Sequence, residues 1–208
     1  KLNDAARARA EDRGKEVDDL QFFHQFAVSN FSIEEDDRNK PFELFVGFLR
    51  ETVDTWFETT DVEDQQEKIT EYLDSNVILR GFGFYLLHEH SEDHSDLVGE
   101  ELLDEENYRD IRLKKEFNLL LKHGFSSIPD DRQQEVVDII NSVPVRDTFE
   151  RIAENRQDEF DDMTIEELVE RRSDRWIRDR LWPIREHLSE EADEQLSQLI
   201  DQFKDEPK

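Results

Sequence analysis

Apolar side chains recur three and four positions apart in one segment after another, and this spacing constrains the fold more than any other feature. Residues spaced in this way lie along one face of an α-helix. The pattern is clearest over 41–57, where Phe45, Leu49 and Trp56 belong to one apolar face. Only six Gly and five Pro interrupt 208 residues, and the alternation typical of strands is scarce. The sequence therefore predicts an all-α chain.

The same periodicity sets approximate bounds for each expected helix. Thr60 and Thr164 are both followed three residues later by Glu, the pattern of a capping box at a helix start. Successive amphipathic helices with short connections favour antiparallel pairs. These pairs would either stack as a HEAT-like α-solenoid or form an irregular multi-helix bundle. The expected helices cover roughly residues 3–30, 41–57, 60–73, 77–88, 95–103, 109–122, 129–144, 146–156, 164–181 and 189–203.

The chain carries 55 acidic against 27 basic residues, a formal net charge of -28. A charge of this size repels itself and destabilises a compact state in ordinary buffer. Disorder is disfavoured, because 35% of the residues are hydrophobic and 15 are Phe. At about 1 M salt the Debye length falls to ~3 Å, so the surface charges barely interact. We therefore expect a folded protein from a salt-adapted source of the haloarchaeal type.

Several classes of protein are disfavoured by what the sequence lacks. Without cysteine there is no disulfide framework, cysteine zinc site or thiol chemistry. No apolar run approaches the ~18 residues of a membrane span, and no signal peptide is visible, so we expect a cytoplasmic protein. We find no P-loop and no dinucleotide fingerprint, and we expect neither a cofactor nor a catalytic role. The sequence does not begin with Met, because its only Met is Met163, and it opens inside a helical pattern. We therefore expect a piece of a longer chain.

We expect one all-helical domain over 1–208, with a possible minor boundary in the polar run at 32–40. The apolar faces that contain Phe22, Phe23, Phe26, Phe42, Phe45 and Phe48 are expected to form core, as are Phe82, Phe84 and Tyr85. Gly81 and Gly83 lie inside an expected helix, where each costs about 1 kcal/mol relative to Ala. Close approach of a neighbouring helix would offset that cost.

One cluster of ligand-type residues lies where the expected helix over 77–88 gives way to a loop. His88, His90 and His94 stand among carboxylates, and imidazole with carboxylate binds zinc, nickel or copper. The spacing does not match H-E-x-x-H, because the second histidine follows the first by two residues. The alternative is a polar helix end at which histidine favours the C-terminal dipole.

A second cluster reverses the local charge of this acidic chain. Arginine binds phosphate and tryptophan stacks on bases, so the two together are typical of nucleic-acid sites. The same side chains also form ion pairs and ring contacts inside a protein. Binding of nucleic acid through counterion release weakens steeply with salt. We therefore favour internal roles first, a protein interface second and nucleic-acid binding third. The candidate residues are Arg171, Arg172, Arg175, Trp176, Arg178, Arg180, Trp182 and Arg185.

Residues 79–199 resemble the helical-repeat region of large prokaryotic STAND-type NTPases, some of which are linked to antiviral defence. The residues that carry the resemblance are Leu79–Leu87, Asp96–Val98, Lys115–Leu120, Gly124–Phe125, and Arg175–Ile184 with His187 and Leu188. It implies a HEAT-like scaffold or sensor arm beside an NTPase domain, and it transfers no catalytic residue.

Together these patterns favour a non-catalytic helical module that contacts a protein partner or other domains of its own longer chain. Two alternatives stay open. One is a nucleic-acid-associated regulator that uses the stretch from Arg171 to Arg185. The other is a metal-dependent enzyme that uses His88, His90 and His94.

Overall fold

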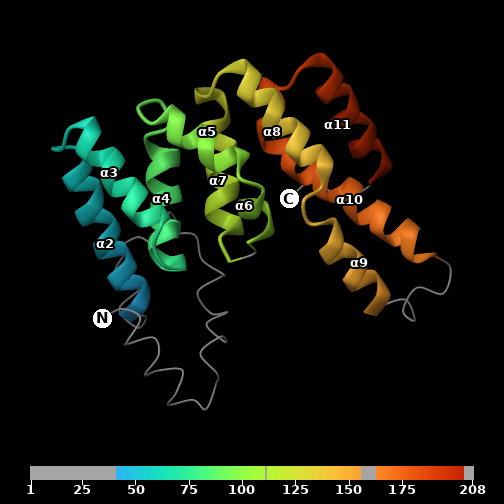
Figure 1. Ribbon diagram of the computed structural model, residues 1–208, viewed down its shortest axis with the longest axis horizontal. Helices are drawn as coiled ribbons and strands as arrows, with labels where there is room; N and C mark the ends of the chain where they lie inside the picture. Colours follow the sequence, from blue (N-terminus) through green and yellow to red (C-terminus); the bar gives the residue numbers. More distant parts are fainter. Residues whose placement is uncertain (1–40, 111, 156–162, 204–208) are drawn as a thin grey trace, which may run out of the picture. The chain divides into compact units, whose positions relative to one another are not determined.

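The computed structural model describes residues 41–110, 112–155 and 163–203, with side chains from Val46 onward. The helix expected over 3–30 and the boundary expected at 32–40 lie outside these residues, as do Phe22, Phe23 and Phe26. All regular elements in the described part are helices (Figure 1), which confirms the all-α prediction in the form of a multi-helix bundle. The finer solenoid arrangement stays a prediction.

The chain divides into two compact units. The first comprises residues within 1–86 and 110–117, and the second comprises 87–109 and 118–208. The division falls inside two helices, α4 (Val77–Glu89) and α7 (Lys114–Gly124). The expectation of a single domain stays a prediction, and each unit is described below by itself.

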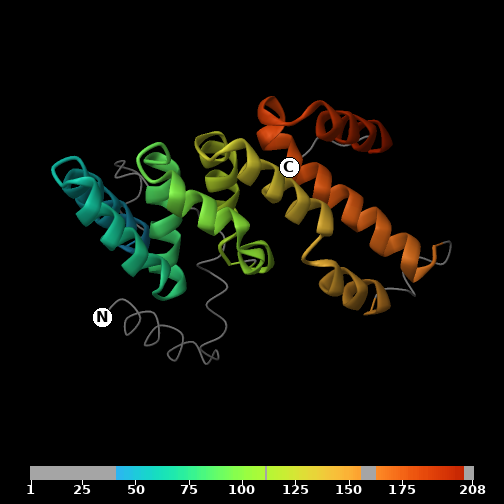
Figure 2. The same ribbon diagram turned by 45° about the horizontal axis from the view of Figure 1, so that its top comes forward.

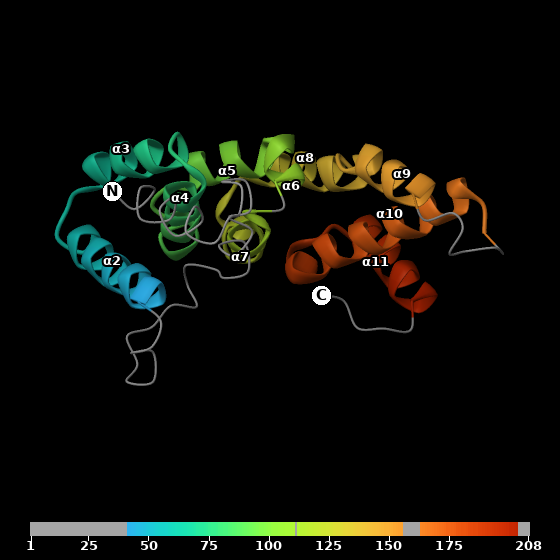
Figure 3. The ribbon, with the colours of Figure 1, turned by 90° about the horizontal axis from the view of Figure 1, so that it is seen from below.

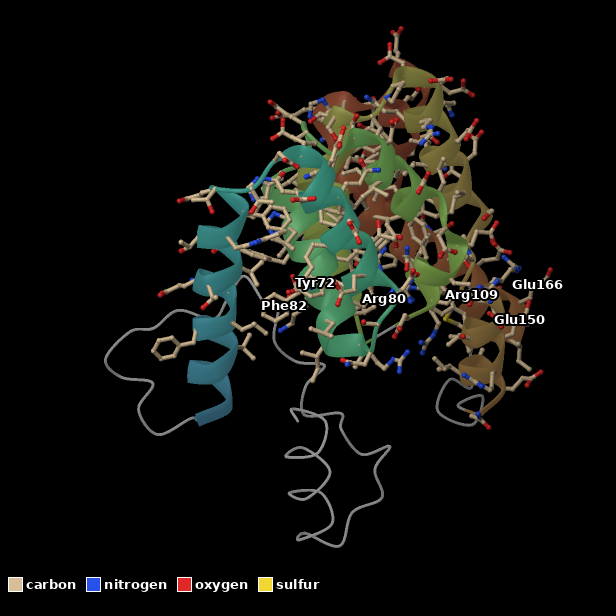
Figure 4. The ribbon with its side chains drawn as sticks, turned by 60° about the vertical axis from the view of Figure 1, so that its left-hand side comes forward. Tyr72, Arg80, Phe82, Arg109, Glu150 and Glu166 are labelled. Carbon is tan, nitrogen blue, oxygen red and sulfur yellow. The ribbon has the colours of Figure 1, made fainter. Side chains whose placement is uncertain are left out.

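The first unit contains α2 (Pro41–Phe57), α3 (Val62–Leu73), most of α4 and the start of α7. Phe57, Ile69 and Phe82 are fully buried, and burial of such a side chain contributes about 1.5–3 kcal/mol. Tyr72 of α3 lies against Phe82 of α4, with ring centroids 6.5 Å apart (Figure 4). Phe82, Phe84 and Tyr85 are buried, as their pattern predicts.

The turn between α2 and α3 is fixed by two polar side chains. Gln65 is buried, and its Nε2 donates to the carbonyl oxygens of Phe57 at 2.7 Å and Thr60 at 3.0 Å. These bonds tie α3 to the last carbonyl of α2 and to a carbonyl of the connecting turn. The expected start at Thr60 is wrong by one residue, because Asp61 is the N-cap and accepts from the backbone N–H of Asp64. Aspartate is as good a cap as threonine, so the motif alone did not separate them.

Gly83 explains why a glycine stands inside α4. A Cβ at this position would lie 2.8 Å from Cδ2 and 2.9 Å from Cγ of Leu73, and 3.3 Å from its backbone N. The close approach expected for a neighbouring helix is therefore present, and it is made by the end of α3. Figure 4 shows α3 and α4 side by side in this unit.

Gly83→Ala is expected to destabilise the protein by about 1–3 kcal/mol, the usual cost of overpacking, despite the better helix propensity of alanine. Gly99→Ala is the matched control, because its Cβ would meet only the flexible side chain of Arg132. That control is expected to be neutral or stabilising. Urea unfolding in concentrated KCl measures both, and equal effects of the two substitutions would contradict the packing argument.

The second unit is built around α10. Helix α10 (Ile165–Leu181) packs against α8 (Asp130–Ser142), α9 (Arg146–Asn155) and α11 (Glu190–Gln202). Figures 2 and 3 show α9 and α11 lying beside α10. The other elements are α5 (Ser95–Leu103), α6 (Glu105–Arg109), the end of α7, and the 3₁₀ turns η4 (Phe125–Ser127) and η6 (Trp182–His187).

The ends of α8 and α10 follow from local sequence. Thr164 forms the expected capping box, since its hydroxyl accepts from the N–H of Glu167 and the Glu167 carboxylate accepts from the N–H of Thr164. Helix α8 ends at Val143 in the left-handed region, with φ of 51°. Pro144 follows directly and cannot continue the helix. Pro183 is the second residue of the turn η6, which follows α10 directly, so the expected interruption at this proline is present.

None of the helices in the described ranges combines the length and the apolar character needed to cross a membrane.

Candidate functional site

Helix α10 divides the arginine–tryptophan cluster between two of its sides. Arg171, Arg175 and Arg178 are spaced by four and three residues, so they share one side. Arg172, Trp176 and Arg180 are spaced by four and share another. The cluster therefore does not form one continuous basic face.

The first side of α10 packs onto the end of α11. The guanidinium carbons of Arg175 and Arg178 lie 5.2 and 5.0 Å from the ring centroid of Phe203, within the range of a cation–π contact. Arg178 is fully buried, and its Nε and Nη2 donate to Oδ1 of Asp179 at 3.0 and 2.7 Å. Arg178 thus serves as an internal cation with a carboxylate and an aromatic ring as partners.

The second side of α10 meets the short helix α6. The rings of Trp176 and Tyr108 have centroids 6.0 Å apart, and the Arg180 guanidinium lies 5.3 Å from the Trp176 ring centroid. Burial of Tyr108 raises its pKa beyond the normal range, while its hydroxyl donates to the Leu102 carbonyl at 2.9 Å. Burial also lowers the pKa of Arg180, which is only 5% exposed. Sequence reasoning did not identify Tyr108, since no motif links it to α10.

The remaining members of the cluster lie in η6 and in the first half of α10. Arg185 donates from Nε to Asp193 at 2.7 Å and from Nη2 to Ser197 at 3.1 Å, with its guanidinium 5.8 Å from the Trp182 ring centroid. Trp182 is 43% exposed. Arg171 is exposed and Arg172 is half-buried. Four of the six arginines thus have internal ring or carboxylate partners, in line with the internal roles that the sequence favours.

Two exposed aromatic residues lie on α2 of the first unit. Phe48 is 61% exposed and Trp56 39% exposed, and the two stand eight residues apart on one helix. We call these two residues the α2 aromatic face. The expectation that Phe48 forms core is wrong, because Val46, Val53 and Phe57 supply the buried face of α2 and Phe48 falls outside it. Phe42 and Phe45 lie beyond the described side chains.

The histidine cluster lies at the end of α4 and the start of α5. The helix stops at Glu89, so His90 and His94 do not share a helical face. His88 packs against His123 of α7 with ring centroids 5.5 Å apart, and its Nδ1 is 3.5 Å from Glu89. His94 is buried, which the interpretation as a solvated helix end did not anticipate. Across the described positions, no three metal-ligating side chains converge on a common point.

The burial of His88 and His94 makes the stability of the second unit pH-dependent. Burial, reinforced by neighbouring imidazoles, lowers the pKa of both below the usual 6.5. As the pH falls through 6.5, the unfolded chain takes up protons that the folded chain resists, so stability declines toward lower pH. His94→Gln is expected to reduce this decline between pH 7 and 5, measured by urea unfolding in concentrated KCl. The exposed His187→Gln is the control, and equal slopes for both variants would contradict the assignment.

One buried acidic residue, Glu116, was not identified from the sequence. Glu116 of α7 belongs to the first unit and is 4% exposed, and neither carboxylate oxygen has a hydrogen-bond partner. Burial raises its pKa to about 8, against the opposing charge of Lys115. It is one of 55 acidic residues, and nothing in its spacing distinguishes it.

No known protein family, curated protein or solved structure matches the chain.

Proposed function

We propose that the chain is a non-catalytic helical module that binds another protein or another part of its own longer chain. The observation that carries the proposal is the α2 aromatic face. Exposed charge is plentiful on this chain, but Phe48 leaves more than half of its surface in water, and Trp56 of the same helix is also exposed. Aromatic residues are enriched at protein interfaces because they bury much apolar area with little loss of side-chain entropy.

The electrostatics favour a protein over a nucleic acid as partner. A chain of net charge -28 repels a polyanion, and only a compact group of arginines would offset that. In the described part of the cluster, Arg175, Arg178 and Arg180 lie against aromatic rings and Arg185 is paired with Asp193. These contacts leave Arg171 and Arg172 as the members best placed for a phosphate, which is a small basic surface.

On this proposal the module acts as a scaffold or sensor arm within a larger protein. The pattern over 79–199 that resembles STAND-type NTPases agrees with such a role, in which an NTPase domain elsewhere supplies the chemistry. A defence-related role would follow from the same resemblance. The partner is then a neighbouring domain or a protein that the larger assembly recognises.

Purification from a salt-adapted host in concentrated KCl tests the proposal. The wild-type chain is expected to retain a specific partner protein that Phe48→Ser loses. Val62→Ser is the matched control, because Val62 is 46% exposed on a different helix and its loss removes a similar exposed apolar group. Equal partner recovery by the two variants, or recovery of nucleic acid in place of protein, would overturn the proposal.

A further inference from the structure

Arg180 differs from Arg112, Arg178 and Arg185 in the way its side-on edge is used. That edge consists of Nε and Nη2, and it matches the two oxygens of a carboxylate. In Arg178 the edge donates to Asp179, in Arg185 it donates to Asp193, and in Arg112 it donates to Asp110 with both distances at 2.8 Å. In Arg180 the Nε is buried and has no hydrogen-bond partner.

The unsatisfied Nε has a physical cost. A buried polar donor without an acceptor costs about 1–3 kcal/mol, and more when the group is charged. The Trp176 ring faces the cation, but it does not replace an acceptor in the plane of the guanidinium. Asp179, whose charge acts on Arg180, already accepts both side-on bonds of Arg178. An added carboxylate would therefore remove a defect without competing with an existing pair.

The surroundings of Arg180 suit an acidic side chain carried on a protein. Tyr108 and Trp176 supply apolar ring surface, and the Tyr108 hydroxyl is occupied by the Leu102 carbonyl. Arg172 lies on the same side of α10, four residues before Trp176, and is half-buried. A contact between one guanidinium and one carboxylate acts at short range, so strong salt weakens it far less than it weakens a polyphosphate contact.

We propose that the Nε edge of Arg180, flanked by Trp176 and Tyr108, receives an Asp or Glu side chain from an acidic segment of a partner protein. The inference rests on the proposed protein-binding function and names the chemistry of one contact. Because Nε is covered, the incoming carboxylate displaces a neighbouring side chain, and the half-buried Trp176 is the one placed to move. Binding therefore changes the environment of the Trp176 indole.

The test uses the whole chain with ¹⁵N labelling in about 1 M KCl, where long-range charge effects are screened. The probe is a short peptide of alternating Glu and Ala, and the same peptide with Gln in place of Glu is the control. The Arg180 Nε–H resonance, assigned by its loss in Arg180→Lys, is expected to shift saturably with the Glu peptide only. A Trp176 fluorescence change, followed in a Trp56→Phe/Trp182→Phe background, is expected to saturate at the same peptide concentration.

Variants separate side-on pairing from simple charge. Arg180→Lys keeps the charge but lacks the side-on edge, so both it and Arg180→Gln are expected to weaken binding about tenfold or more. Arg171→Gln removes an exposed arginine from the same helix and is expected to change binding less than about twofold. The proposal is overturned by an unmoved Nε–H resonance, by equal shifts with both peptides, or by wild-type affinity in Arg180→Lys.

The Trp176 fluorescence reading keeps Arg180 in place and needs no resonance assignment, so the comparison of the Glu and Gln peptides stands even where Arg180→Lys fails to fold. A failure of the Glu peptide to bind at Arg180 is also distinguishable from a failure of the proposed function. The proposed function is tested by other variants, at the α2 aromatic face, and by recovery of the partner protein.

Discussion

Replacing Glu116 by Gln is expected to stabilise the protein at alkaline pH by about 5 kcal/mol, the largest effect of any substitution considered for this chain. The buried carboxyl has a pKa of about 8, and the unfolded chain has the ordinary value of 4.5. Between these values the folded state keeps a proton that the unfolded state has lost, so stability falls as the pH rises. The difference between these two pKa values, at about 1.4 kcal/mol per unit, gives the expected stabilisation of about 5 kcal/mol.

Gln is nearly isosteric with protonated Glu, so the two proteins are expected to have similar stability near pH 5 and to diverge as the pH rises toward 9. Urea unfolding at a series of pH values in concentrated KCl measures the divergence. Glu63→Gln is the control, since Glu63 is exposed on α3 of the same unit. Parallel stability curves for wild type and Glu116→Gln across this range would show that the carboxyl is not buried as described.

Arg178→Ala is expected to destabilise the second unit by about 3–5 kcal/mol, the usual cost of removing one partner from a buried ion pair. The substitution leaves the Asp179 carboxylate without its two guanidinium bonds and uncovers the Phe203 ring. Arg178→Lys is expected to recover only part of the loss, because an ammonium group cannot form the side-on pair.

Arg171→Ala supplies the comparison, because it removes an exposed arginine from the same side of α10. Its effect is expected to stay within about 0.5 kcal/mol, as is usual for surface substitutions. The urea midpoints of Arg178→Ala and Arg171→Ala, measured in the same salt, test whether the two substitutions differ in their effect on stability. Equal midpoints would mean that the buried contacts of Arg178 contribute nothing to stability.

The fold class and most helix bounds could be predicted, because periodicity and capping are local properties. The capping box at Thr164, the break between Leu73 and Val77 and the turn at Pro183 all follow from residues close together in sequence. The start of α3 was misplaced by one residue because Thr60 and Asp61 are both good caps. The sequence cannot choose between them without the packing of Gln65.

The candidate sites were harder to predict, because burial depends on contacts between distant segments. Phe48 belongs to the same apolar repeat as buried neighbours on α2, yet the neighbouring helices leave it exposed. Arg178 and Arg180 look alike in sequence, but Asp179 pairs with one and leaves the Nε of the other without an acceptor. The partners Phe203 and Tyr108 lie far along the chain from these arginines, and no motif connects them.

Site-specific photo-cross-linking in the host cell tests the central claim most directly, because it records what lies against the α2 aromatic face. A photoreactive phenylalanine analogue at position 48 is expected to capture one defined protein, or another part of the longer chain. The same analogue at the exposed position 62 of α3 is expected to capture that partner much less efficiently. Equal capture at both positions, or none at position 48, would contradict a partner-binding role for this face.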